Sequence, residues 1–259
     1  MKRVRLHSRK ACRQSWTAVR QQPLLLGFSL VSLGAHLLGW ALFAAAEQVE
    51  SGVLAALLHL LGLALYAGSL LWMIEGFTQA GLSLAQGQAI TWKELSPGAC
   101  RHSGRLCLCL GALVAALAAT GLITGLLWSL LLLALPAMSV VPALLGLIAA
   151  GAVILSQLFG PCLVVDTRLS TTSGFRQGVW LLEHHWAGLI KLSSYLVALL
   201  LLPLLAGLLA EALLEGLGIV ATVVSLVVVL PLITTSVTGA YWQLRPELTT
   251  TSSIKRSGR

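Results

Sequence analysis

Six stretches of almost uninterrupted hydrophobic residues alternate with short polar segments along this chain of 259 residues. A helix of about 20 apolar residues crosses the roughly 30 Å hydrocarbon core of a bilayer. Each stretch is long enough to do so, and the pattern therefore predicts an all-α integral membrane protein with six spans. The predicted bounds are 24–46, 52–76, 106–131, 143–165, 189–210 and 216–242.

Short amphipathic segments are predicted before spans one, three and five. Before span five, an apolar stripe at helical spacing is formed by Phe175, Val179, Leu182 and Trp186, and Arg176 lies away from it. A helix with such a stripe that is too polar to span the bilayer is typical of the membrane interface. The predicted fold is therefore a six-span helical bundle with interfacial helices before alternate spans.

The same design occurs at the N-terminus, 163 residues earlier. The positions equivalent to the stripe are held by Cys12, Trp16, Val19 and Pro23, and Arg13-Gln14 matches Arg176-Gln177. Near the same offset, Glu47 and Gly52 correspond to Glu211 and Gly216. This indicates a parallel duplication of one unit, an interfacial helix, a span, an acidic turn and a second span.

The chain is predicted to form a single polytopic membrane domain over 1–259. Its segments are a basic lead-in 1–22, a first hairpin 24–76, a loop 77–105, a second hairpin 106–165, an interfacial helix 166–188, a third hairpin 189–242 and a basic tail 243–259. The apolar run after the lead-in is too long for the h-region of a signal peptide, so we expect it to be retained as span one.

Composition and charge support this architecture and orient it. Hydrophobic residues make up 57% of the chain and charged residues only 10%, which excludes an ordinary soluble domain. All 17 Lys and Arg fall on the two tails and on the segments 77–105 and 166–191, which share one side, whereas the opposite turns carry acids. The positive-inside rule then predicts that both termini are cytoplasmic. The net charge of +8 favours anionic lipid headgroups as partners, and no nucleic-acid-binding motif accompanies it.

Several local patterns predict where helices begin, end and pack. Thr91-x-x-Glu94 is a capping-box pattern. Gly87 is expected to break the helix that continues from span two, and Gly160-Pro161 is expected to kink or end span four. Gly121-x-x-x-Gly125 in span three is expected to pack inside the bundle, and a dimer interface is the alternative. Glu75, at the end of span two, is expected to be a solvated carboxylate among the headgroups.

Two histidines in the first hairpin are the candidate cofactor ligands. His36 and His59 are expected within about 5 Å of each other in depth on adjacent antiparallel helices. Two facing imidazoles would hold a haem axially or ligate the magnesium of a pigment. The alternative is a neutral imidazole hydrogen-bonded to a serine or a carbonyl group. No resident cofactor is therefore assigned from the sequence.

Catalytic and metal-binding patterns are absent from the sequence. It contains no defensible Ser-His-Asp or paired-carboxylate constellation and no Walker or Rossmann glycine pattern. The five cysteines lie within spans or on the predicted cytoplasmic side, which argues against a disulfide framework. The protein is accordingly predicted not to be an enzyme and to hold no metal.

A family resemblance rests on the segments that flank the spans. The helix Ala11-Cys12-Arg13-Gln14-Ser15-Trp16, the loop Ala85 to Ile90, and Asp166 followed by Arg176-Gln177-Gly178 are its motifs. With these the chain resembles the bacterial membrane proteins related to the membrane domain of glycerophosphoryl diester phosphodiesterase, which include YciC-type inner-membrane proteins. Gly178 and Val179 depart from this pattern, because those proteins usually have a serine and an aromatic residue at these two positions. The resemblance implies a six-helix bundle in a bacterial inner, or thylakoid-type, membrane, and no hydrolase domain is present.

The sequence favours a role in membrane organisation, as a scaffold, an assembly partner of another membrane protein, or a lipid-contacting protein. Its recognisable pattern lies at the interface, whereas the spans are nearly free of charge. The residues expected to contact lipid or a partner are Arg13, Trp16, Phe175, Arg176, Val179, Leu182 and Trp186. One alternative is a small-solute or lipid transporter, which requires a polar cavity reaching the middle of the bilayer. Another is a haem- or pigment-binding protein that uses His36 and His59.

Overall fold

The computed structural model describes residues 6–96, 101–134, 138, 140–167 and 171–257, and these form helices without any strand. The helices are α1 (Ser8–Gln21), α2 (Leu24–Ala46), α3 (Gly52–Ala85), α4 (Trp92–Leu95), α5 (Ser103–Ala134), α6 (Val140–Ser156), α7 (Gly160–Thr167), α8 (Thr171–Leu213) and α9 (Leu217–Ser257). Six helical segments, with α6 and α7 taken as one, are long and apolar enough to cross a membrane. The all-α, six-helix prediction is confirmed.

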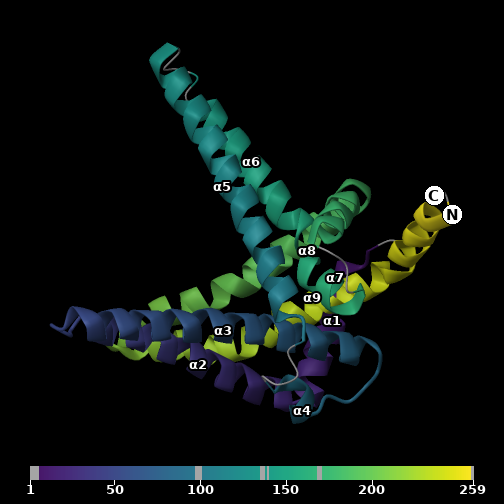
Figure 1. The fold of residues 1–259 in the computed structure, drawn as a ribbon. Coiled ribbons are helices and arrows are strands. Elements are labelled where there is room, and N and C mark those ends of the chain that lie inside the picture. Colours follow the sequence, from purple (N-terminus) through teal and green to yellow (C-terminus); the bar gives the residue numbers. More distant parts are fainter. Residues whose placement is uncertain (1–5, 97–100, 135–137, 139, 168–170, 258–259) are drawn as a thin grey trace.

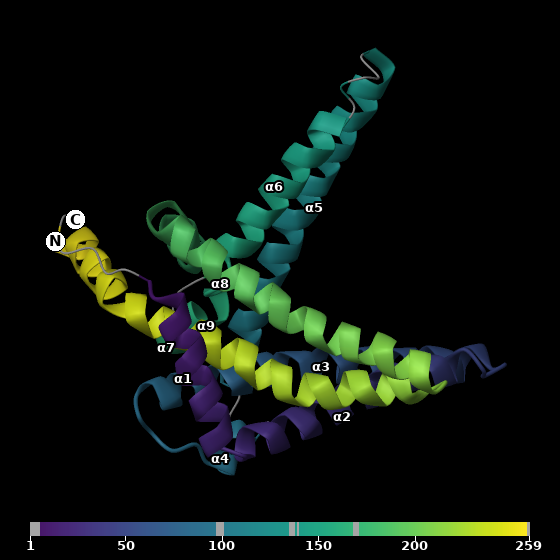
Figure 2. The ribbon, with the colours of Figure 1, turned by 180° about the vertical axis from the view of Figure 1, so that it is seen from behind.

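The six long segments are arranged as three hairpins. The α2–α3 hairpin and the α8–α9 hairpin pack against each other, with α9 against both α2 and α3 (Figures 1 and 2). The α5–α6 hairpin projects away from these two hairpins and meets them only near its own base. The two parts of the predicted duplication therefore pack on each other, while the middle hairpin stands apart.

Short helices precede spans one, three and five. Helix α1 crosses α9 before the chain enters α2 (Figure 2). Helix α4 is a single turn, and its capping box between Thr91 and Glu94 is present as predicted. The lead-in to span five is continuous with it in α8, but the helix kinks at His185, where φ is −128° and ψ is 21°.

Glycines allow the closest approach of the two helices in the first and third hairpins. A Cβ atom at Gly39 would lie 2.8 Å from the backbone nitrogen of Tyr66, and one at Gly218 would lie 2.8 Å from the carbonyl oxygen of Gly207. Small residues of this kind let membrane helices pack backbone to backbone. By contrast, a Cβ at Gly121 or Gly125 would meet nothing within 4 Å. The expectation that this pair packs inside the bundle is wrong, because the α5–α6 hairpin diverges from the other spans.

The two predicted helix breaks are present. Helix α3 continues past residue 76 as far as Ala85, and Gly87 then takes a positive φ of 74°, which glycine adopts without a steric penalty. Span four is interrupted between Ser156 and Gly160, immediately before Pro161. The second break turns α7 towards α9.

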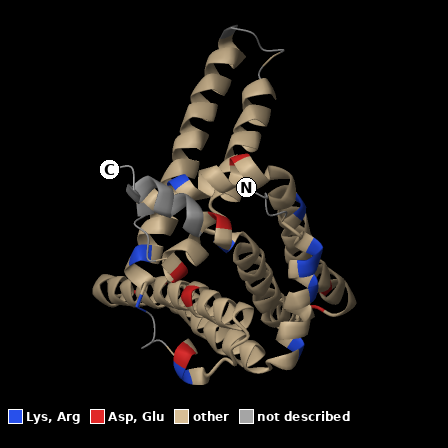
Figure 3. Cartoon of the chain, turned by 90° about the vertical axis from the view of Figure 1, so that its right-hand side faces the viewer, with Lys and Arg blue, Asp and Glu red and all other residues tan. Residues whose placement is uncertain are grey.

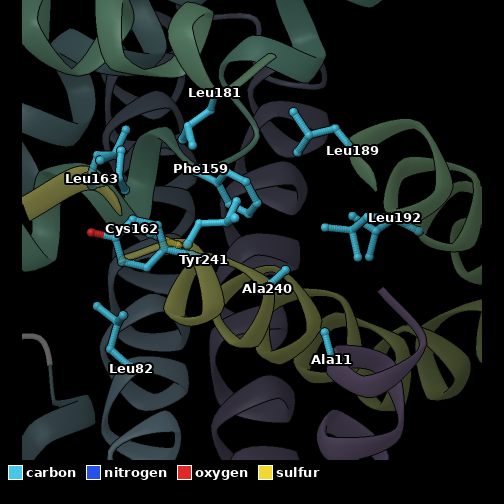
Figure 4. Packing of buried hydrophobic residues seen from close by; sticks show 13 residues of the cluster. Ala11, Leu82, Phe159, Cys162, Leu163, Leu181, Leu189, Leu192, Ala240 and Tyr241 are labelled. Atoms are coloured by element: carbon cyan, nitrogen blue, oxygen red, sulfur yellow. The ribbon is translucent and has the colours of Figure 1, made fainter. Parts of the chain in front are cut away.

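The main buried cluster lies where α1, α7, α8 and α9 meet (Figure 4). Tyr241 lies at its centre and is completely buried, next to Phe159 from the α6–α7 break. Ala11 from α1 and Leu181 and Leu189 from the two sides of the α8 kink complete it. The lead-in helices are therefore held in place by the ends of the spans.

Candidate functional site at the basic ends of the helices

Most of the charged side chains gather at one end of the assembly. Figure 3 shows Lys, Arg, Asp and Glu around the region of α1, α4 and α7, and none along the outer length of the α5–α6 hairpin. We call this region the basic end; among its exposed cations are Arg13, Lys93 and Arg176. It is the part of the molecule in which polar chemistry is concentrated.

The predicted stripe on the lead-in part of α8 lies beside the buried face of that helix. Gly178 and Leu181 face the core, whereas the side chains of Trp186 and Val179 are 61% and 36% exposed. Phe175 and Leu182 are partly buried, and Leu182 packs against the core cluster. The stripe therefore presents apolar side chains outward, next to the exposed Arg176.

Helix α1 has the same arrangement. Ala11, Ser15 and Val19 are buried, while Trp16 is 52% exposed and Arg13 is exposed. Cys12 of the predicted stripe is partly buried. This burial raises the pKa of the Cys12 thiol above its usual range, and the thiol is protonated at neutral pH.

The structures of the two lead-ins support the duplication. Gln22, which ends α1, has φ −123° and ψ 77°, and His185 at the α8 kink has φ −128°. These two breaks are 163 positions apart, the offset that relates Arg13 to Arg176. Ala11 and Ser15 are buried, as are the residues that this offset assigns to them in α8. The two lead-in helices are therefore interrupted at equivalent positions.

An ion pair joins the end of span four to α9. Arg245 donates from Nε to Asp166 Oδ2 (2.8 Å) and from Nη2 to Oδ1 (3.0 Å), and the hydroxyl of Tyr241 donates to Oδ2 (2.9 Å). The Arg245 guanidinium also lies 4.4 Å from the centroid of the Trp242 ring. The Asp166 side chain is only 8% exposed, and these donors replace the water that burial removes from its carboxylate. Sequence reasoning singled out Asp166 but not its partners.

A second polar contact lies at the kink of α8. His185 Nε2 is 2.9 Å from Glu247 Oε2, which joins the kink to α9 two residues beyond Arg245. His185 falls within the predicted interfacial helix 166–188, but its partner lies 62 residues away. Long-range pairs of this kind leave no local pattern in a sequence.

Glu75 is not solvated, and that expectation is wrong. The residue is completely buried, and its Oε1 accepts hydrogen bonds from the backbone N–H of His102 (2.8 Å) and from Gln79 Nε2 (3.1 Å). His102 Nδ1 lies 3.3 Å from the same oxygen. Because α3 runs on to Ala85, Glu75 lies inside the helix rather than at its end, and the segment that leads into α5 covers it.

The two candidate haem ligands are not brought together. His36 Nδ1 lies 3.2 Å from Ser69 Oγ and its ring packs on Tyr66, whereas His59 Nδ1 lies 2.8 Å from the carbonyl oxygen of Ala55. Two helical turns separate Tyr66 from His59, so the histidines differ in depth by about 10 Å. The expected separation of about 5 Å is wrong. Both imidazoles have the serine or carbonyl partner of the alternative interpretation.

A cavity of about 760 Å³ lies between α1, the end of α3 and α9, and we call it the α1 cavity. Lys10 and Arg13 line it, together with hydroxyl and amide side chains. These polar lining residues are Gln14, Ser15, Thr17, Gln21, Gln22, Gln88, Thr235 and Gln243. No Asp or Glu of the described chain lines it. Of the predicted interface residues, Arg13 is the one that contributes to this cavity.

A smaller cavity of about 370 Å³ lies on the opposite side of the end of α3. Its lining includes Glu94, Asp166 and His102, so its character is acidic. Within the described ranges, no three His, Cys, Asp or Glu side chains are grouped so that they could hold a metal ion. The end of α3 thus separates a basic cavity from an acidic one.

Comparison with known proteins adds no assignment. No family model, curated protein or solved structure matches this chain. The resemblance noted from the sequence stays a prediction.

Proposed function

We propose that this multi-pass membrane protein is a non-enzymatic, membrane-organising protein that contacts anionic lipid headgroups and neighbouring membrane proteins through its basic end. The observation that carries the proposal is the exposed tryptophan on each of the helices α1 and α8. Trp16 and Trp186 are more than half exposed, and each belongs to a helix that also exposes an arginine, Arg13 or Arg176. Tryptophan and arginine are both favoured where a helix meets the membrane interface.

The orientation follows from the same arrangement. With the lead-in helices in the headgroup layer, the basic end faces the cytoplasm and the acidic turns face the opposite side, in a bacterial inner or thylakoid-type membrane. The buried face of each lead-in helix rests on the ends of the spans, so the helices are held in the interface by packing as well as by charge.

The positions of the cavities favour this role over transport. A transporter binds its substrate near the middle of the bilayer. Both cavities are lined from the basic ends of the spans, and neither takes a lining residue from 24–78 or 167–234. A headgroup-level role needs no path through the membrane.

The test is the recovery of lipids and proteins extracted together with the protein in polymer-bounded discs of native membrane. Phe175→Asp combined with Trp186→Asp places two charges on the stripe and should lower the recovery of anionic lipid and of cross-linked neighbours several-fold. Because Phe175 is partly buried, Trp186→Asp alone is the cleaner variant, with His184→Asp on an exposed polar position of the same helix as its control. Unchanged recovery with Trp186→Asp would contradict the proposal.

A further inference from the structure

The α1 cavity has the electrostatic character of an anion site. Lys10 and Arg13 line it, and within the described chain neither forms an ion pair. The nearby acids are bound to other partners, Asp166 to Arg245, Glu247 to His185 and Glu75 to His102. The positive charge of the cavity is therefore not neutralised by the protein.

Gln243 adds a hydrogen-bond donor without an acceptor. The backbone N–H of His7 donates to Gln243 Oε1 (3.0 Å). Because a backbone N–H can only donate, the atom of the Gln243 side chain that it contacts must be the amide oxygen. This fixes the orientation of the side-chain amide, and the second atom of that amide is the donor Nε2. Nε2 is buried and has no hydrogen-bond partner in the described residues, although Gln243 lines the cavity. A buried donor without an acceptor is costly, which implies an acceptor supplied from outside the chain.

The depth of the cavity indicates where that acceptor comes from. Gln21 and Gln22 form part of its wall, and span one begins directly afterwards at Leu24. The cavity thus lies where span one begins, at the level of the lipid phosphates under the proposed placement of α1. Its volume of about 760 Å³ is within the roughly 300–1,000 Å³ typical of small-molecule sites.

We propose that the α1 cavity binds a phosphate group, supplied by the headgroup of an anionic phospholipid, through Lys10, Arg13 and Gln243 Nε2. This deepens the proposed function and rests on it, because it replaces diffuse attraction to anionic lipid by one defined site. Arg and Lys are the side chains that bind phosphate oxygens in proteins, and the glutamine amide supplies a neutral donor to the same oxygens.

The experiment uses the full chain, delipidated in mild detergent and titrated with phosphatidylglycerol, phosphatidylcholine or sodium phosphate, with bound ligand counted by native mass spectrometry. Lys10→Gln/Arg13→Gln is compared with Arg9→Gln/Arg20→Gln. Both pairs remove two charges from exposed positions of α1, but Arg9 and Arg20 do not line the cavity. Gln243→Glu keeps the acceptor for His7 and removes the free donor.

We expect one phosphatidylglycerol per chain, an affinity at least about tenfold lower in Lys10→Gln/Arg13→Gln and in Gln243→Glu, and less than about twofold change in the control pair. Binding of sodium phosphate with the same variant pattern, but not of the lipid, would keep the phosphate site and assign it a soluble ligand. Equal weakening by both α1 pairs would overturn the site while leaving a diffuse lipid-contacting role intact. No retention of phosphatidylglycerol or phosphate by the unmodified chain would overturn the site as well, and an absence of any preference for phosphatidylglycerol over phosphatidylcholine would count against the proposed function.

Discussion

Asp166 and Arg245 are 79 positions apart in the chain and meet in a two-pronged ion pair, with Nε–Oδ2 at 2.8 Å and Nη2–Oδ1 at 3.0 Å. The pair connects the short helix that ends span four to the last span. Tyr241, which donates to the same carboxylate, is the largest fully buried side chain among the described residues. The contact therefore holds the middle hairpin to the rest of the protein where the two otherwise diverge.

Replacing Asp166 by Asn should destabilise the protein. The substitution leaves the Arg245 guanidinium without its carboxylate, and Arg245 is 38% exposed, so solvent screening limits the loss to about 2 kcal/mol. Thermal unfolding in detergent measures the effect. Glu183→Gln, at an exposed carboxylate of α8, is the control and should unfold like the unmodified protein. Equal midpoints for both variants would show that the ion pair contributes nothing.

Gly178→Ala and Gly174→Ala should have opposite effects on stability. A Cβ at Gly178 would clash with the carbonyl oxygen of Ser156, whereas a Cβ at Gly174 meets nothing within 4 Å. We expect Gly178→Ala to lower the free energy of unfolding by about 1–3 kcal/mol through overpacking, and Gly174→Ala to be neutral or to raise it by up to about 1 kcal/mol through helix propensity. The same thermal assay compares them, and a stable Gly178→Ala protein would contradict the close approach of α8 to the end of α6.

The exposed stripe should lie in the interface. In a cysteine-free background, an environment-sensitive dye attached to Trp186→Cys is expected to emit at shorter wavelength in vesicles than one attached to His184→Cys. The reason is that Trp186 belongs to the stripe and His184 does not, although both are exposed and they lie one residue to either side of the kink at His185. Identical emission at the two positions would place the stripe in water.

The basic end should be accessible from one side of the membrane. Arg101→Cys and Arg176→Cys, each in the cysteine-free background, should react with a membrane-impermeant maleimide only when the cytoplasmic face is open. Gln48→Cys, in the first acidic turn, should react only from the opposite face. Labelling of Arg101→Cys and Arg176→Cys from different faces would exclude six spans with both ends on one side.

The residues that sequence reasoning placed well are those whose behaviour depends on near neighbours. Gly87 ends α3 because a positive φ suits glycine, and Thr91 and Glu94 form their capping box within a single turn. The partner of Glu75 was missed because His102 lies 27 positions away, in the segment that leads into α5. The depth of His59 was misjudged because α2 and α3 pack at a different register. Both features depend on the packing and register of helices that are distant in the sequence.

The number of spans, the gathering of cations on alternate connections and the amphipathic lead-ins were determined by the sequence alone. The free energy of transferring an apolar segment into a bilayer is nearly the sum of the contributions of its residues. It can therefore be judged from the sequence without a structure. The tertiary structure alone decided which side chains meet: Arg245 with Asp166, His185 with Glu247, and Lys10 and Arg13 with Gln243 around one cavity. Such contacts depend on the packing and register of distant helices. The sequence around a carboxylate or an amide does not indicate which distant residue will contact it.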